Sequence, residues 1–212
     1  MIIDAATLGT WAIVRGRAYE WRCGLAVGWR FAMCCAMFCL TGVLAQVRVP
    51  LPWTPVSLTG QVFAVLLAGL MMGKHYGAIS QVLYVGLGAA GIPWFAGWTS
   101  MSIFGPTGGY LLGCIPVAAL VGWLTDRPLA PSRRRVLVAM FAGVAIIYLC
   151  GALRFALIMR TGFRATLVSS VLPFAPLDSV KAVLAALLAF VLLPGERHPR
   201  GVDSIHAAQM HR

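Results

Sequence analysis

The chain has 212 residues, of which 60% are hydrophobic and only 11% charged, and its mean hydropathy is +0.85. Soluble domains are roughly 45–50% apolar and about 25% charged, so this composition excludes a water-soluble enzyme and a disordered chain. Because a helix that crosses a bilayer needs about 20 mostly apolar residues, the sequence predicts a membrane protein with several spans. A formal net charge of +11 would suggest nucleic acid for a soluble protein, whereas in a membrane protein it raises the question of where the charges lie.

Apolar runs separated by Gly, Pro and charged residues predict six membrane-spanning helices. In chain order they cover residues 29–47, 57–72, 77–90, 107–124, 136–159 and 177–193. The second run stops at Gly73, and the sixth is bounded by Pro176 and Pro194, which are residue types that end or begin helices. The predicted fold class is therefore all-α, with six transmembrane helices in one bundle. This divides the chain into an N-terminal extension (1–28), the bundle (29–193) and a C-terminal tail (194–212).

The basic residues fall mainly on one side of the predicted bundle. If the N-terminus is cytoplasmic, the inner side carries Arg15, Arg17, Arg22, Arg30, Lys74, Arg127, Arg133, Arg134, Arg135, Arg197, Arg200 and Arg212. The outer side carries only Arg48, Arg160 and Arg164, and Arg154 and Lys181 fall within predicted spans, which accounts for all 17 Lys and Arg residues. Lys and Arg are enriched in cytoplasmic loops, so this distribution predicts cytoplasmic N- and C-termini in a cell membrane, plasma or inner. The excess of positive charge is thus explained by the orientation of the protein in the membrane. No nucleic acid is therefore predicted as a partner.

The predicted outer loop 92–106 is long and uncharged, and it is rich in aromatic residues: Trp94, Phe95, Trp98 and Phe104. A loop of this kind is expected to fold over something rather than extend in water. Two interpretations remain open at this point. The loop is either a lid or wall of a binding pocket, or a belt of aromatic side chains at the membrane surface.

Three ionisable residues lie within the predicted spans, where such residues are costly and mark functional sites. Asp178 and Lys181 are three residues apart, so they share a helix face and offset each other's charge. The carboxylate accepts N–H bonds and the ammonium meets a carboxylate or carbonyl oxygen, which predicts a ligand site; a structural pair at the membrane surface is the alternative. Arg154 lies about 9 Å of helix from Arg160 and is expected to reach the outer surface, with a ligand carboxylate as its alternative contact.

Other polar and small residues of the spans are first interpreted as packing features. Gln61 and Tyr84 need hydrogen-bond partners in a dry setting, and a neighbouring helix provides these as well as a ligand does. Ala32 and Ala36 form a pair of small residues that allows close approach of another helix, either of this chain or of a partner subunit. Glycines at every fourth position, Gly105, Gly109 and Gly113 among them, predict a similar close approach in the fourth span.

The sequence lacks the common signatures of catalysis. It has no Gly-x-Ser-x-Gly or His-Glu-x-x-His motif, and no cluster of His and carboxylate residues falls within the predicted spans. We therefore predict that the protein is not an enzyme and that it holds no cofactor and no metal.

Four motifs follow one another along the predicted bundle. They are Pro52-x-x-Pro55-Val56-x-x-Thr59-x-Gln61, Tyr84-x-x-Leu87-Gly88-x-x-Gly91-Ile92-Pro93-x-Phe95, Gly105-Pro106-Thr107-Gly108-Gly109-Tyr110-Leu111, and Leu172-Pro173-Phe174 followed by Asp178-x-x-Lys181. Over roughly residues 32–193 this pattern resembles the BioY family, the biotin-specific S components of energy-coupling-factor (ECF) transporters. The glycine-rich third motif is the most specific part of the resemblance.

The resemblance implies a six-helix substrate-binding subunit that captures biotin near the outer face of the membrane for uptake. It implies as partners a transmembrane coupling protein, which Ala32 and Ala36 would contact, and paired ATPase subunits. The substrate-binding residues that it implies are Asp178, Lys181, Tyr84, Gln61, Trp94 and Phe95. The family is typically apolar or aromatic where this chain has Arg154. An S component for another small vitamin and a small membrane-embedded enzyme are the alternatives.

Overall fold

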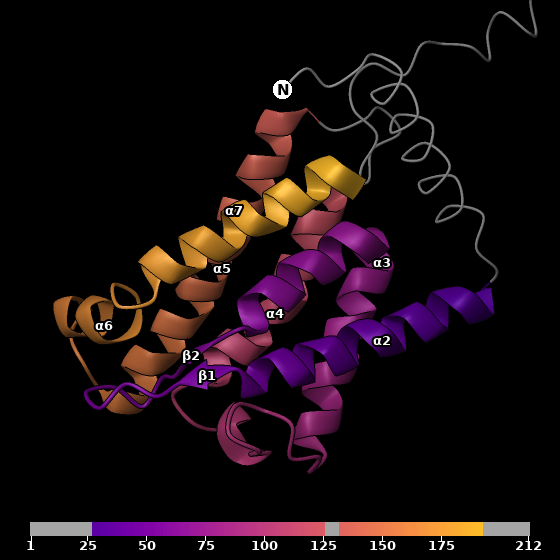
Figure 1. Cartoon of the computed structure of the whole chain (residues 1–212). Helices are drawn as coiled ribbons and strands as arrows, with labels where there is room; N and C mark the ends of the chain where they lie inside the picture. Colours follow the sequence, from indigo (N-terminus) through magenta and orange to yellow (C-terminus); the bar gives the residue numbers. More distant parts are fainter. Residues whose placement is uncertain (1–26, 126–131, 193–212) are drawn as a thin grey trace, which may run out of the picture.

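The computed structural model describes residues 27–125 and 132–192. Its helices are α2 (Val27–Gln46), α3 (Gln61–Ala89), α4 (Gly108–Thr125), α5 (Arg133–Met159), α6 (Phe163–Ser170) and α7 (Ala175–Leu192) (Figure 1). A short antiparallel sheet joins β1 (Arg48–Val49) to β2 (Leu58–Thr59), and η1 (Met101–Ile103) is a single 3-10 turn. The predicted tail 194–212 and nearly all of the predicted extension 1–28 lie outside the described residues.

The structure confirms the six predicted helices. By length and composition α2, α3, α4 and α5 are able to cross a membrane, and α6 with α7 forms a further candidate span that is bent by 56°. The helix α3 is kinked at Gly73 (φ 72°, ψ −172°), a conformation that favours glycine, so its two segments are the predicted second and third spans. Figure 1 shows α3 running in one direction and then returning after the kink. Gly77 of the returning segment lies against the backbone of Ala68 and Gly69.

Two predicted boundaries are wrong for physical reasons. The second span was expected to begin at residue 57, but the chain is extended there because Leu58 and Thr59 pair with β1. No helix was predicted for residues 161–176, between the fifth and sixth spans, but this segment contains the helix α6. This helix is short and carries Arg, Thr and Ser residues, so no long apolar run marks it in the sequence.

Small residues bring the central helices close together. A side chain at Gly69 would meet the carbonyl oxygen of Ala118 at 2.6 Å, and one at Gly113 would meet the Cys150 side chain at 3.2 Å. Gly109 likewise lies against the Cys150 carbonyl, so the predicted close approach is confirmed for Gly109 and Gly113. The core around these contacts is formed by fully buried residues of α3, α4, α5 and α7, including Val65, Leu66, Leu70, Val117, Val121, Met140, Ile147, Ala182, Ala185 and Ala189.

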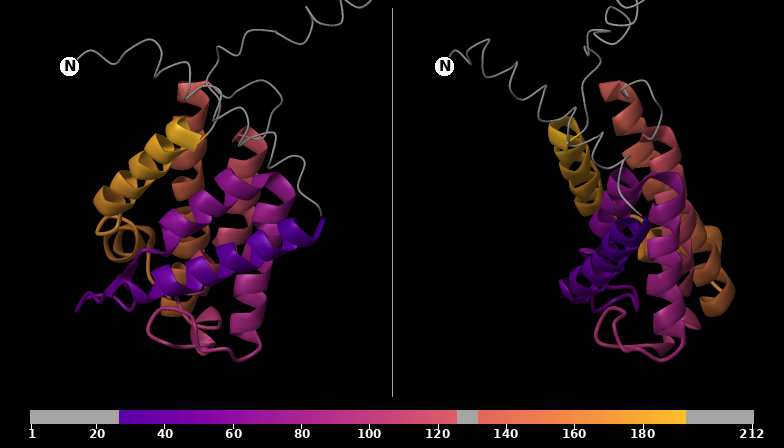
Figure 2. Two further views of the ribbon diagram at one scale, coloured as in Figure 1. Left: turned by 45° about the vertical axis from the view of Figure 1, so that its right-hand side comes forward. Right: turned by 90° about the vertical axis from the view of Figure 1, so that its right-hand side faces the viewer.

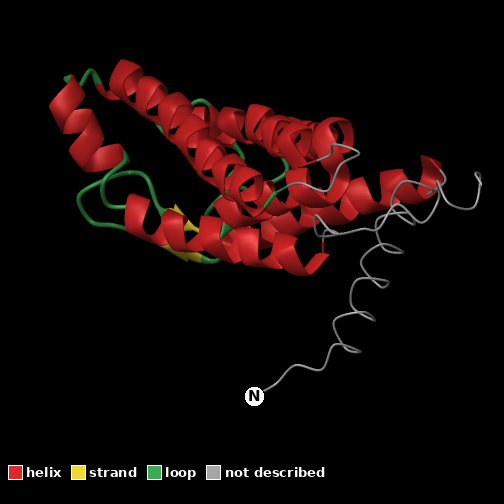
Figure 3. Cartoon of the chain, turned by 90° about the horizontal axis from the view of Figure 1, so that it is seen from above, coloured by secondary structure: helices red, strands yellow, loops and turns green. Residues whose placement is uncertain are grey.

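The three segments that the sequence places on the outer side lie at the same end of the bundle. In Figure 1 the β1–β2 hairpin, the loop with η1, and α6 all lie toward the lower end, and the two views of Figure 2 agree. Figure 3 shows that nearly all of the described chain is helical and that the strands are confined to the hairpin. Segments far apart in the sequence therefore meet at this end, where the candidate site lies.

Candidate ligand-binding site

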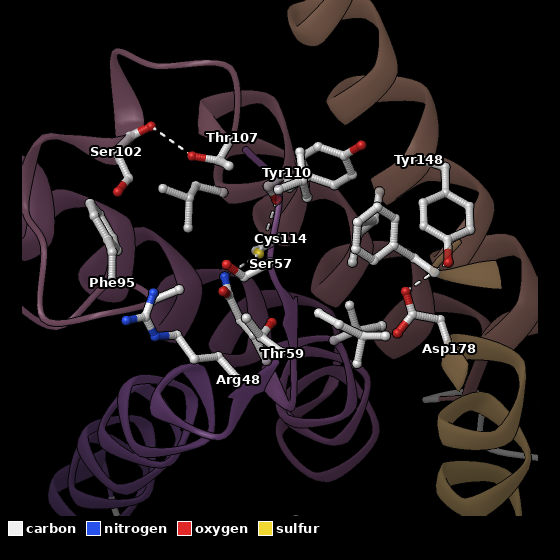
Figure 4. A pocket seen from close by; sticks show the side chains of 18 of the residues that line it. Arg48, Ser57, Thr59, Phe95, Ser102, Thr107, Tyr110, Cys114, Tyr148 and Asp178 are labelled. Atoms are coloured by element: carbon white, nitrogen blue, oxygen red, sulfur yellow. Dashed lines mark hydrogen bonds between the residues drawn. The ribbon is translucent and has the colours of Figure 1, made fainter. Parts of the chain in front are cut away.

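A cavity lies at this end of the bundle, and each of the three predicted outer segments contributes to its wall (Figure 4). Its volume is about 180 Å³. A bound water needs roughly 10–15 Å³ on the same measure, so the cavity accommodates a small organic molecule rather than a single water. The residues that line it are Arg48, Pro55, Val56, Ser57, Leu58, Thr59, Gln61, Val62, Phe95, Ala96, Ser102, Thr107, Tyr110, Leu111, Cys114, Ile147, Tyr148, Phe174 and Asp178.

The buried charge of the site is Asp178, in the first turn of α7. Helix α7 begins at Ala175, with Pro176 in its first turn, and an acidic residue near a helix N-terminus is stabilised by the helix dipole. Asp178 is only 4% exposed; its Oδ1 accepts a hydrogen bond from Lys181 Nζ and its Oδ2 accepts one from the Tyr148 hydroxyl, each at 2.7 Å. A buried carboxylate persists only when it is paired in this way. Each of its oxygens retains a lone pair that is able to accept an N–H group from a ligand.

The predicted pair of Asp178 and Lys181 is confirmed as an ion pair, but its two members lie differently. Asp178 lines the cavity, whereas Lys181 does not. The ammonium donates a second hydrogen bond to the Thr59 carbonyl at 2.5 Å, which connects α7 to β2. Lys181 therefore positions the carboxylate from outside the cavity, and its bond to Thr59 also fixes β2, which forms part of the cavity wall.

The aromatic side of the cavity is Phe95, from the loop that precedes η1. Its side chain is fully buried, and its ring occupies the space that a side chain at Gly88 would fill. Tyr84 packs against Phe95 edge-on, with ring centroids 5.5 Å apart, and Trp94 lies 5.6 Å from Tyr84. Of these three predicted residues, Phe95 lines the cavity, while Tyr84 and Trp94 support it from behind. Gln61 also lines the cavity, and its amide donates to Cys114 Sγ at 3.4 Å.

The loop 92–106 lies partly in the cavity wall and partly on the exposed surface. Phe95, Ala96 and Ser102 form part of the cavity wall. Trp98 and Phe104 are instead 71% and 63% exposed, as expected for aromatic residues at a membrane surface.

Sequence reasoning missed several residues of the cavity. Arg48 was recognised only as an outer charge, yet it lines the cavity, and its guanidinium lies 2.6 Å from where a side chain at Gly97 would begin. Tyr110 and Tyr148 fall within the predicted apolar spans and were not predicted as site residues. The available signal was their hydroxyl groups, since a buried tyrosine needs a hydrogen-bond partner: Tyr110 donates to the Ser170 carbonyl and Tyr148 to Asp178.

The glycine-rich motif has a structural explanation at this site. A side chain at Gly108 would collide with the Ile103 carbonyl, and one at Gly109 with the carbonyl of Cys150 in α5. The ring of Tyr110 in turn lies on Gly151 of α5. The motif thus lets α4 begin in direct contact with both η1 and α5, and this contact places Tyr110 in the cavity wall.

The fold and the site together define a multi-pass helical membrane protein with a cavity of small-molecule size at one end of its bundle. The described residues contain no group of three or more His, Cys, Asp or Glu residues able to hold a metal ion. The BioY family model matches residues 23–196, and the chain belongs to the BioY family.

Comparisons with individual proteins agree with this membership. The chain is 40% identical over 152 residues to the probable biotin transporter BioY of Pyrococcus horikoshii, covering 71% of this chain and 87% of the relative. It is 38% identical over 146 residues to the biotin transporter BioY of Thermotoga maritima, covering 68% and 85% respectively. Among solved structures, the S-component for biotin from an ECF-type ABC transporter has the same fold, with a TM-score of 0.69 at 21% identity over 78% of this chain and 93% of that one.

Proposed function

We propose that the chain binds biotin in this cavity and acts as the substrate-binding subunit for biotin uptake. The observation that carries the proposal is the hydrogen-bonded network of Tyr148, Asp178 and Lys181, which presents the buried Asp178 carboxylate at one side of the cavity. Biotin offers a ureido ring with two N–H groups and a carbonyl, an apolar thiophane ring and a carboxylate on a flexible chain. Asp178 accepts the ureido N–H groups, and Phe95 covers the apolar ring. The relatives named as biotin transporters, and membership in their family, favour this function over that of an enzyme.

The other predicted residues take supporting roles in this proposal. Lys181 holds the Asp178 carboxylate in place through their ion pair and connects it to the Thr59 carbonyl. Gln61 offers an amide at the cavity wall. Tyr84 and Trp94 hold Phe95 in position from behind.

Arg48 is the group that fits the ligand carboxylate. Figure 4 places Arg48 and Asp178 at different sides of the cavity, with Thr59 between them in this view. A guanidinium binds a carboxylate through paired hydrogen bonds, and the biotin carboxylate lies at the end of a chain that leads away from the ureido ring. Biotin is therefore oriented with its ureido ring at Asp178 and its carboxylate at Arg48.

Replacement of Arg48 by glutamine is expected to weaken biotin binding by about three- to tenfold, since this ion pair is partly open to water. Biotinamide, which lacks the negative charge, should bind the variant and the unchanged protein about equally. Equilibrium binding of both ligands to purified protein measures the difference. Arg164→Gln, an exposed arginine of α6 away from the cavity, is the control. An equal loss for biotin and biotinamide would contradict the assignment of the carboxylate to Arg48.

The proposed function is tested by identifying the small molecule that purifies with the protein. The detergent-solubilised protein is denatured, the released ligand is identified by mass spectrometry, and binding of radiolabelled biotin is measured in parallel. Chemically intact biotin in the released fraction, together with saturable binding, is the expected result. A different vitamin that excess biotin does not displace would assign the cavity to another substrate, and a chemically altered ligand would indicate an enzyme.

The location, orientation and partners of the subunit complete the proposal. The basic residues and the common position of the three outer segments support a cell-membrane protein with cytoplasmic N- and C-termini and biotin entering from outside. Residues 1–28 and 194–212 would then be cytoplasmic and residues 29–193 the substrate-binding bundle. Ala32 and Ala36 are exposed on α2, which leaves this small-residue surface available to a transmembrane coupling protein joined to paired ATPases.

A further inference from the structure

Arg154, on α5, makes two hydrogen bonds to the loop that carries η1. Its Nη2 donates to the Ile103 carbonyl at 3.3 Å and to the Phe104 carbonyl at 3.2 Å. These carbonyls lie at the end of the η1 turn, where a helical turn leaves its last carbonyls without backbone partners. A positive charge at such an end is electrostatically favourable. Arg154 was expected to extend to the outer surface, but its guanidinium is hydrogen-bonded to the loop.

The carbonyls that Arg154 holds are directly connected to the cavity wall. Ser102 precedes Ile103 and lines the cavity, and its carbonyl accepts a hydrogen bond from the Thr107 hydroxyl at 3.2 Å. Thr107 lines the cavity as well. Since the residues from Ser102 to Thr107 form one compact turn, a side chain that fixes its middle also fixes the two cavity-lining residues at its ends.

The two halves of the loop are held by different helices. Gln46, at the end of α2, holds the first half: its amide donates to the carbonyls of Trp94 and Phe95, and its oxygen accepts from the backbone N–H groups of Gly97 and Trp98. In the second half, over the described residues 101–106, Arg154 is the side chain of a distant helix that makes hydrogen bonds to the loop. The second half thus depends on Arg154.

We propose that Arg154 is a positioning residue that keeps the wall formed by Ser102 and Thr107 closed over the bound ligand and thereby slows ligand release. The identity of the ligand rests on the function proposed above, whereas the effect of Arg154 on the loop does not. Loss of the guanidinium frees the turn that carries Ser102 and Thr107, and the ligand then leaves more readily without losing its contact with Asp178.

The effect on the loop is measured first, without ligand. Hydrogen exchange followed by mass spectrometry is compared for the purified protein, Arg154→Met, Arg154→Lys and the control Arg164→Met, over a peptide that spans residues 99–108. The amides of Phe104 and Gly105 are bonded within the turn. Their exchange is expected to be about tenfold faster in Arg154→Met, intermediate in Arg154→Lys, which retains a donor, and unchanged in Arg164→Met. Unchanged exchange in Arg154→Met would overturn the proposal.

The effect on the ligand is measured second, as the rate at which bound radiolabelled biotin leaves after a chase with unlabelled biotin. Arg154→Met is expected to release biotin about five- to tenfold faster than Arg164→Met, with Arg154→Lys between them. Faster exchange with an unchanged release rate would overturn the role in ligand retention. Faster exchange in a protein whose unaltered form binds no biotin would instead reject the proposed function and leave the positioning of the loop by Arg154 standing.

Discussion

Replacement of Asp178 by asparagine is expected to lower the affinity for biotin by tenfold or more while the helix bundle stays folded. Asparagine has nearly the same shape and retains one oxygen for the Tyr148 hydroxyl, but it lacks the negative charge that strengthens hydrogen bonds to the ureido ring. A hydrogen bond to a charged group contributes about 1.5–3 kcal/mol, which corresponds to roughly a 10- to 100-fold change in affinity. Equilibrium binding of radiolabelled biotin to purified protein measures the loss.

A second variant of the ion pair and a control variant on the same helix test whether this loss of affinity is specific to the site. Lys181→Ala removes the partner of the carboxylate and the bond to Thr59, so it should also lose tenfold or more in affinity, and it should unfold at a lower temperature because a buried charge is left unpaired. Ser179→Ala, on the same helix but outside the cavity wall, should bind biotin normally. Unchanged biotin binding in both Asp178→Asn and Lys181→Ala would remove this pair from the site.

Replacement of Gly88 by alanine is expected to abolish most biotin binding by displacing an aromatic ring rather than by removing a contact. An added methyl group would lie 2.8 Å from Cε2 of Phe95 and closer still to two other atoms of the same ring. Because the ring lies between Gly88 and the cavity, and because Tyr84 packs against it edge-on, it can yield only at the expense of cavity volume. We expect a loss of more than tenfold in affinity, measured as above, together with a lower unfolding temperature.

The same helix offers a matched control for this substitution. A side chain at Gly86 would meet nothing within 4 Å, so Gly86→Ala adds the same methyl group and should leave binding unchanged. A second substitution, Phe95→Leu, shortens the displaced side chain and should restore part of the binding in the Gly88→Ala background. Failure of this rescue, with a folded double variant, would show that the methyl group acts by another route.

The local features of the site could be predicted from the sequence. Asp178 and Lys181 share a helix face at a spacing of three residues, and the cost of burying charge in a membrane singles them out regardless of tertiary structure. The break at Gly73 follows from residue types that interrupt a helix. In each case the relevant geometry is contained in a few consecutive residues.

The remaining features depend on contacts between distant segments. Arg48 has the same sequence signal as other exposed basic residues, and only the pairing of β1 with β2 brings it to the cavity. Tyr148 and Tyr110 look like ordinary apolar core residues until their hydroxyl groups find Asp178 and Ser170. Trp94 was predicted to bind the ligand directly, but its packing against Tyr84 places it behind Phe95 and outside the cavity wall.

The hydrogen bond from Lys181 to Thr59 has a consequence for biosynthesis. It joins residues 122 positions apart, and it belongs to the ion pair that holds the carboxylate in the cavity. Membrane proteins are synthesised from the N-terminus, so the hairpin, α3, α4 and α5 are all made before α7. A nascent chain that ends before α7 therefore lacks the carboxylate and the hydrogen bond from Lys181 to Thr59. On the function proposed above, such a chain binds no biotin until α7 has been inserted into the bilayer.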